Sequence, residues 1–270
     1  MSGWDIRVED IRYAYGDVEA LRGISLEIRA GESVALIGRN GAGKTTLTRA
    51  LVALNRPAAG RVAVGDWDVA ARRPDEMARR IGYVFQHADQ QLFARTVRED
   101  VSFGPRRLGR RGPVDAVLGE LSLAPYADTH PYDVPGPLRK MVALAGVLAM
   151  EPGALILDEP TAGLDRVQRA LVARALRRRS EAGVTLLVVS HDLGFVAEVA
   201  ERVVVMERGR IVADRPARDF LYDTEVLGAL ELRPPATVEI GLALKLPGAP
   251  VRSEEVTAAM KGVKWKEYAG

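Results

Sequence analysis

Residues 38–46 read GRNGAGKTT, and this stretch decides the fold because of what stands on either side of it. The run before it, Ser33–Ile37 (SVALI), is apolar enough for a buried strand, and the residues after it, from about Gly43 to Leu54, favour a helix. A strand, a glycine-rich loop with the spacing G-x-x-x-x-G-K-[ST] and a helix, in this order, are typical of phosphate binding. The sequence therefore predicts a nucleotide-binding protein.

The residue types in this loop suit an anion. Glycines allow backbone N–H groups to turn inward around a phosphate, and the start of the helix adds its positive end. Lys44 is expected to reach the β- and γ-phosphates, and the Thr45 hydroxyl to ligate Mg²⁺. ATP and Mg²⁺ are thus the predicted ligands. The loop residues expected at the nucleotide are Gly38, Asn40, Gly41, Gly43, Lys44, Thr45 and Thr46.

Length and composition bound the class of protein. A chain of 270 residues can hold one large α/β domain with a small appendage. It has no run of eighteen apolar residues, and its first sixteen residues lack the apolar core of a signal peptide, so we expect it to stay in the cytoplasm. The absence of cysteine excludes a disulfide framework and cysteine-ligated zinc. A net charge of +2 gives no reason to expect nucleic acid as a partner.

The chain order predicts an α/β fold of the P-loop NTPase type. Residues 5–30 read as an antiparallel pair, whereas later strands alternate with helices and carry polar residues at their carboxyl ends, which indicates a mostly parallel sheet. We expect a catalytic or signalling loop over 87–104, a helical subdomain over about 90–150, a main domain over 1–222 and an extension over 223–270 with two short helices.

Four further side chains fit ATP hydrolysis. Asp158 ends an apolar strand and is expected to hold Mg²⁺, and Glu159 is the expected general base. Gln86 and His191 also follow predicted strands, where an amide and an imidazole can contact the metal, the water or the γ-phosphate. The expected Mg²⁺ ligands are Thr45, Gln86 and Asp158.

Tyr15 stands at the turn of the first predicted hairpin. Its ring offers a face on which an adenine can stack, although a tyrosine at a turn more often serves packing.

Together these motifs resemble the ATP-binding subunit of ABC transporters over nearly all of residues 5–220. GRNGAGKTT is similar to Walker A, LILDEP (155–160) to Walker B, AGLD (162–165) to the D-loop and SHD (190–192) to the histidine switch. The resemblance implies an ATPase in which Tyr15 stacks on adenine, Gln86 senses a membrane partner and Glu159 is the base. It also implies that His191 holds the γ-phosphate and that Asp165 communicates across a dimer of two ATPase subunits.

Three stretches are similar to one branch of that family, the energy-coupling-factor importers of cobalt, nickel and vitamins. They are YVFQHADQQLFARTVREDVSFGP (83–105), AGVLAMEPGALILDEPTAGLD (145–165) and PPATVEIGLALKLPG (234–248). The resemblance implies transmembrane partner subunits and a peripheral place on the cytoplasmic face of the membrane. Two alternatives stay open: a soluble ABC-type ATPase outside transport, and a regulatory ATP-binding subunit with little turnover.

The chain departs from the family at the signature loop, LSGGQ, which closes over the partner subunit's ATP. The matching residues are Val134, Pro135, Gly136, Pro137 and Leu138. Two prolines lack the backbone N–H that a phosphate needs, so this half of the dimer interface is expected to be weakened and the dimer to be asymmetric. In the alternative interpretation the prolines merely start a helix, and Gly136 with the helix dipole suffices.

Overall fold

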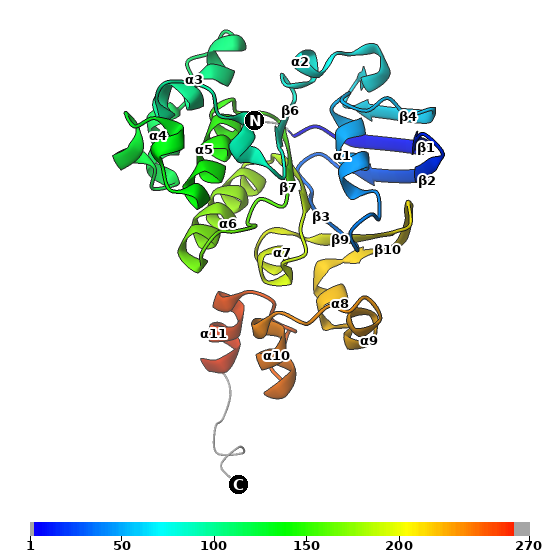
Figure 1. The fold of residues 1–270 in the computed structure, drawn as a ribbon. Coiled ribbons are helices and arrows are strands. Elements are labelled where there is room, and N and C mark those ends of the chain that lie inside the picture. Colours follow the sequence, from blue (N-terminus) through cyan, green and yellow to red (C-terminus); the bar gives the residue numbers. More distant parts are fainter. Residues whose placement is uncertain (1–2, 262–270) are drawn as a thin grey trace.

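The computed structural model describes residues 3–261, apart from the side chains of residues 88 and 89, and it places the phosphate loop between two sheets. A four-stranded antiparallel sheet has the order β2-β1-β4-β5, and a six-stranded sheet has the order β10-β9-β3-β8-β7-β6. Helices α3, α4 and α5 lie on the side of the large sheet away from the antiparallel strands, and α8 to α11 lie beyond its β9–β10 end (Figure 1).

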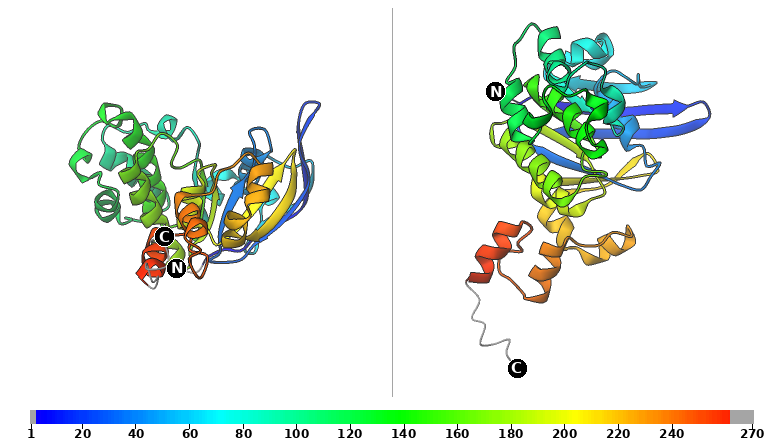
Figure 2. Two further views of the ribbon diagram at one scale, coloured as in Figure 1. Left: turned by 90° about the horizontal axis from the view of Figure 1, so that it is seen from below. Right: turned by 60° about the vertical axis from the view of Figure 1, so that its left-hand side comes forward.

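The antiparallel sheet forms where the sequence predicts it. Polar and apolar residues alternate along β1, which turns at Gly16 and pairs with β2 from Ile6↔Ile28 to Tyr15↔Val18. This long hairpin projects beyond the rest of its sheet (Figure 2). The strands are β1 (Ile6–Tyr15), β2 (Val18–Ile28), β4 (Ala59–Val64) and β5 (Trp67–Asp68).

The large sheet is parallel except for β10, as predicted. Every residue of β3, β7 and β8 is buried, which explains why these strands read as continuous apolar runs. Because they are parallel, their carboxyl ends meet at one edge, where the predicted site residues follow. The strands are β3 (Ser33–Ile37), β6 (Ile81–Val84), β7 (Ala154–Asp158), β8 (Thr185–Val189), β9 (Arg202–Glu207) and β10 (Arg210–Pro216).

The helix predicted after the phosphate loop is present but shorter. It ends at Leu51 rather than near Leu54, because the N–H groups of Leu54 and Asn55 both turn back to the Arg49 carbonyl. The α-helices are α1 (Lys44–Leu51), α2 (Pro74–Met77), α3 (Val97–Arg107), α4 (Val114–Glu120), α5 (Gly136–Ala149), α6 (Arg166–Glu181), α7 (Leu193–Val199), α8 (Ala217–Tyr222), α9 (Thr224–Ala229), α10 (Ala236–Ala243) and α11 (Ser253–Lys261).

The prediction of a loop over 87–104 is wrong for its second half. Helix α3 begins at Val97, because the Thr96 hydroxyl accepts a hydrogen bond from the Glu99 N–H at 3.1 Å. Thr96 followed three residues later by Glu99 is a helix-start signal that the sequence does contain. The helix then buries Val97 and Val101. The region that follows Gln86 is therefore a short loop leading into a helix.

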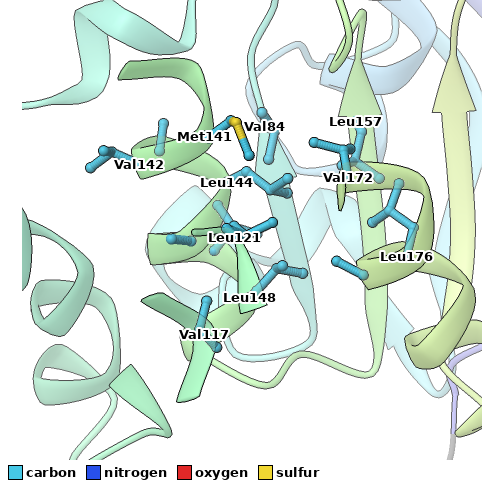
Figure 3. Close-up of a cluster of buried hydrophobic side chains, with 14 of the residues drawn as sticks. Val84, Val117, Leu121, Met141, Val142, Leu144, Leu148, Leu157, Val172 and Leu176 are labelled. Carbon is cyan, nitrogen blue, oxygen red and sulfur yellow. The ribbon is translucent and has the colours of Figure 1, made fainter. Parts of the chain in front are cut away.

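Three clusters of buried side chains support the site. The first joins α5 and α6 to β6, β7 and β8, and Figure 3 shows Leu144, Leu148, Leu157 and Leu176 meeting within it. The second fills the space between the two sheets and α1. The third joins β9 and α7 to the C-terminal helices through Phe220 and Leu227. No helix within residues 3–261 is long and apolar enough to cross a membrane.

Candidate functional site

The phosphate loop connects β3 to α1 and depends on glycine at two positions. Gly38 has φ 156°, and a Cβ on it would lie 2.2 Å from the Met206 carbonyl oxygen. Gly43 has φ 99°, and its Cβ would lie 2.5 Å from the Ala20 carbonyl oxygen. The backbones of β9 and β2 thus press on the loop, and no larger residue fits these two places without a shift.

Lys44 lies within the curve of the loop. Its Nζ donates to the carbonyl oxygens of Gly38 at 2.6 Å and Arg39 at 3.0 Å. Burial lowers the pKa of Lys44, while the carboxylates of Glu159 and Asp158 act in the opposite direction. The ammonium group therefore stands between the loop carbonyls and two acidic side chains, where a phosphate group would meet it.

Thr45 and Asp158 meet although 113 residues separate them. The Thr45 hydroxyl donates to Asp158 Oδ2 at 2.7 Å. Burial raises the pKa of Asp158, and the Thr45 hydrogen bond and the Lys44 charge oppose that rise. A hydroxyl and a carboxylate in contact fit Mg²⁺, which needs oxygen ligands and is usually held by few protein groups together with water and phosphate.

The described residues contain no group of three His, Asp or Glu side chains placed to hold a metal. A cation at Thr45 and Asp158 would therefore take the rest of its shell from phosphate and water. Gln86 lies beside this pair and lines the same cavity.

Glu159 and His191 come together at the ends of β7 and β8. Nδ1 of His191 lies 2.9 Å from Oε1 of Glu159, and the Glu159 side chain is 13% exposed whereas that of His191 is 74% exposed. Glu159 has φ 51°, an unfavourable conformation for a side chain other than glycine. Lys140, which sequence reasoning missed, holds this turn by donating to the carbonyl oxygens of Glu159 and Ala162, both at 3.1 Å.

Tyr15 lines a cavity of about 510 Å³ that the phosphate loop forms with the acidic residues. Tyr13 packs edge-on against the Tyr15 ring, with centroids 4.9 Å apart. Asn55 Nδ2 donates to the Tyr15 hydroxyl at 3.1 Å, and sequence reasoning missed this contact. Asn40, Gly41, Gly43, Lys44, Thr45, Thr46, Gln86, Asp158 and Glu159 line the same cavity as Tyr15.

Two predicted groups stand apart from this cavity. Gly136 to Leu138 form the first turn of α5, after Val134, which is buried, and Pro135, which caps the helix without a side-chain hydrogen bond. Asp165 caps α6, where its carboxylate accepts from the Gln168 N–H at 2.8 Å and the Gln168 side chain accepts from the Asp165 N–H at 3.0 Å. Within this chain both groups serve as helix starts.

The chain is similar to known proteins over most of its length. A family profile described as ABC transporter matches residues 21–162. The energy-coupling factor transporter ATP-binding protein EcfA of Methanothermobacter thermautotrophicus is 39% identical, over 90% of this chain and 81% of that protein. The cobalt import ATP-binding protein CbiO of Rhodobacter capsulatus is 40% identical, over 88% of each.

A solved structure agrees with these relatives. It is CbiO1 from Clostridium perfringens, described as part of the CbiONQ complex, with 33% identity and a TM-score of 0.72 over 90% of this chain and 100% of that one. The chain spans 40% of the length of another relative, a putative ABC transporter ATP-binding protein of Methanosarcina acetivorans. The chain belongs to the ABC transporter family, as an ATPase cassette in which ATP hydrolysis is coupled to transport.

Proposed function

We propose that this chain powers substrate uptake in a transporter of the energy-coupling-factor type, with cobalt, nickel or a vitamin as cargo. The similarity to EcfA and to CbiO supports this branch. The single observation that carries the ATPase role is the meeting, at one sheet edge, of the Thr45–Asp158 and Glu159–His191 pairs beside the phosphate loop.

The proposed chemistry divides between these residues. Lys44 and the loop amides bind the phosphates, and Tyr15 stacks on the adenine. Thr45 and Asp158 would hold Mg²⁺, which would supply positive charge to neutralise the phosphates. Glu159 accepts a proton from the attacking water, and His191 orients the carboxylate and contacts the γ-phosphate. Gln86, two residues after the end of β6, links this site to the helical region over about 90–150.

We propose that the helical region binds a transmembrane subunit at the cytoplasmic face of the membrane. Phe93 and Phe103 lie edge to face with ring centroids 4.7 Å apart, and Phe93 is 63% exposed. Tyr132 is also exposed, and its hydroxyl donates to the Leu92 carbonyl. Exposed aromatic side chains in the helical region suit an interface rather than a solvated surface.

We further propose that the chain works with a second ATPase subunit and that the two sites differ. At the start of α5, Pro135 and Pro137 have no N–H, and the Leu138 and Arg139 N–H groups both point to the Pro135 carbonyl. Among residues 135–139 this leaves the Gly136 N–H for a phosphate. The site that this chain completes on its partner is therefore the weaker one, and Asp165 lies on the same interface.

The experiment combines purification with activity. The tagged chain, extracted with mild detergent from membranes of its source organism, should carry membrane proteins and a second ATPase subunit with it. The complex should hydrolyse ATP much faster than the chain alone. Strong ATPase activity of the chain alone would contradict the asymmetric dimer. Absence of membrane proteins would favour a soluble ATPase, and turnover unaffected by Glu159→Gln would favour a regulatory subunit.

A further inference from the structure

The C-terminal region reaches the candidate site. Leu230, Glu231 and Leu232 follow α9 and line a cavity of about 440 Å³ together with Arg39, Glu159 and His191. Helices α8 and α9 lie below the end of β10 (Figure 1). The residues after the main sheet therefore form part of the wall around the proposed general base.

One ion pair joins this region to the phosphate loop. Arg39 Nη2 donates to Glu231 Oε2 at 2.9 Å, across 192 positions of the sequence. The two side chains are 65% and 70% exposed. Exposed pairs of this kind contribute little to the stability of a fold. The pair matters instead for the local charge, because Glu231 neutralises the Arg39 guanidinium beside the loop.

A folded turn holds the Glu231 carboxylate in position. Glu231 has φ 59°, its N–H donates to the Gly228 carbonyl at 3.1 Å, and the Leu232 N–H donates to the Leu227 carbonyl at 2.8 Å. This is the hydrogen-bond pattern of a helix end that usually has glycine at the left-handed position. Leu227 is fully buried, and Leu230 and Leu232 pack against the same cluster. The hydrogen bonds of the turn and the packing of its leucines therefore hold the Glu231 carboxylate in place.

Arg39 is the one loop residue whose side chain this carboxylate contacts. It follows Gly38 directly, and its carbonyl oxygen accepts from Lys44 Nζ at 3.0 Å. With Glu231 in place the Arg39 charge is balanced. Without Glu231 a second cation would stand beside Lys44 at a loop that binds a polyanion.

We propose that Glu231 is a positioning residue that holds Arg39 away from the nucleotide phosphates and so lowers the affinity for ATP. The C-terminal region thereby sets the affinity of a site to which it contributes no phosphate ligand. This inference rests on the proposed binding of ATP by the phosphate loop. It does not depend on the transported substrate or on the second subunit.

The test measures the Kd for ATP by calorimetry on the full chain, in low and high salt. Glu231→Gln should bind ATP about 2- to 10-fold more tightly than wild type in low salt, with the difference shrinking as salt screens the charges. In an Arg39→Gln background, Glu231→Gln should have no effect. Glu225→Gln, an exposed side chain on α9, makes the same chemical change as a matched control and should leave Kd unchanged.

The outcomes separate the inference from the proposed function. Tighter binding by Glu231→Gln with unchanged kcat supports the inference, because a merely structural residue would weaken binding when lost. Equal or weaker binding by Glu231→Gln, or an equal effect of Glu225→Gln, overturns it while leaving ATP binding itself intact. A wild-type chain that binds no ATP overturns the proposed function together with the inference.

Discussion

Nδ1 of His191 lies 2.9 Å from Oε1 of Glu159, and the other carboxylate oxygen, Oε2, is buried without a hydrogen-bond partner among the described residues. Buried polar atoms are normally satisfied, so an unsatisfied one calls for an explanation. The imidazole holds one oxygen of the carboxylate, and the second oxygen is left without a partner. For Glu159 to act as the proposed general base, this second oxygen has to become accessible to the attacking water when nucleotide binds.

Replacing Glu159 by Gln tests that role. Glu159→Gln keeps the shape of the side chain but removes its basicity, so kcat should fall by about 10²- to 10⁴-fold while the Kd for ATP changes little. Steady-state ATPase assays of the assembled complex and ATP titrations measure the two quantities. Glu181→Gln, at the exposed end of α6, is the matched control. Unreduced turnover would show that Glu159 is not the base.

Asp158 is expected to lower the stability of the unliganded protein at neutral pH. Burial raises the pKa of Asp158 in the folded protein. The contribution of Asp158 to the free energy of unfolding is therefore favourable at low pH and is lost as the pH rises through the raised pKa. At neutral pH without ligand, Asp158→Asn should therefore raise Tm by a few degrees while weakening the binding of Mg²⁺ and ATP.

The difference in Tm between Asp158→Asn and wild type should depend on pH. The difference in Tm between Asp158→Asn and wild type should shrink as the pH falls toward the ordinary carboxyl pKa of about 4. Asp75→Asn, on the exposed start of α2, is the control and should show no such trend. Thermal denaturation at several pH values measures it, and a lower Tm for Asp158→Asn at neutral pH would contradict the account.

Asn55 should act on ATP through Tyr15. The hydrogen bond from Asn55 Nδ2 to the Tyr15 hydroxyl fixes the ring, so Asn55→Ala should raise KM for ATP by about 2- to 10-fold without changing kcat. Tyr15→Phe, which keeps the ring but loses the hydroxyl, should have a similar effect. The double variant should be no worse than either single variant, and additive losses would show that Asn55 acts by another route.

Restoring backbone N–H groups at the start of α5 should raise the ATPase activity of the chain. Pro135→Ser with Pro137→Gly returns a hydroxyl and two backbone N–H groups to the start of α5, where a Cβ at Gly136 would meet open space. ATPase activity of the chain alone should then rise by about 10-fold or more, since a single such donor is worth about 10²-fold or more at other active sites. Pro113→Ser, at the start of α4, is the control. No gain would favour the interpretation in which these prolines merely start a helix.

Much of the fold follows from local pattern. The apolar runs of β3, β7 and β8 and the loop GRNGAGKTT predict strand, loop and helix because each depends on neighbours in sequence. The start of α3 was also readable, since Thr96 and Glu99 form a helix-start signal. The polar residues around it led to the wrong prediction of a loop.

The sequence by itself determined the parallel sheet, the phosphate loop and the acidic residues that follow β7. It did so because glycine spacing and apolar periodicity are local properties. Only the tertiary structure brought Lys140 under the Glu159 turn, Asn55 to Tyr15 and Glu231 to Arg39. These contacts link positions far apart in the chain, and each depends on how sheets and helices pack, which no local pattern records.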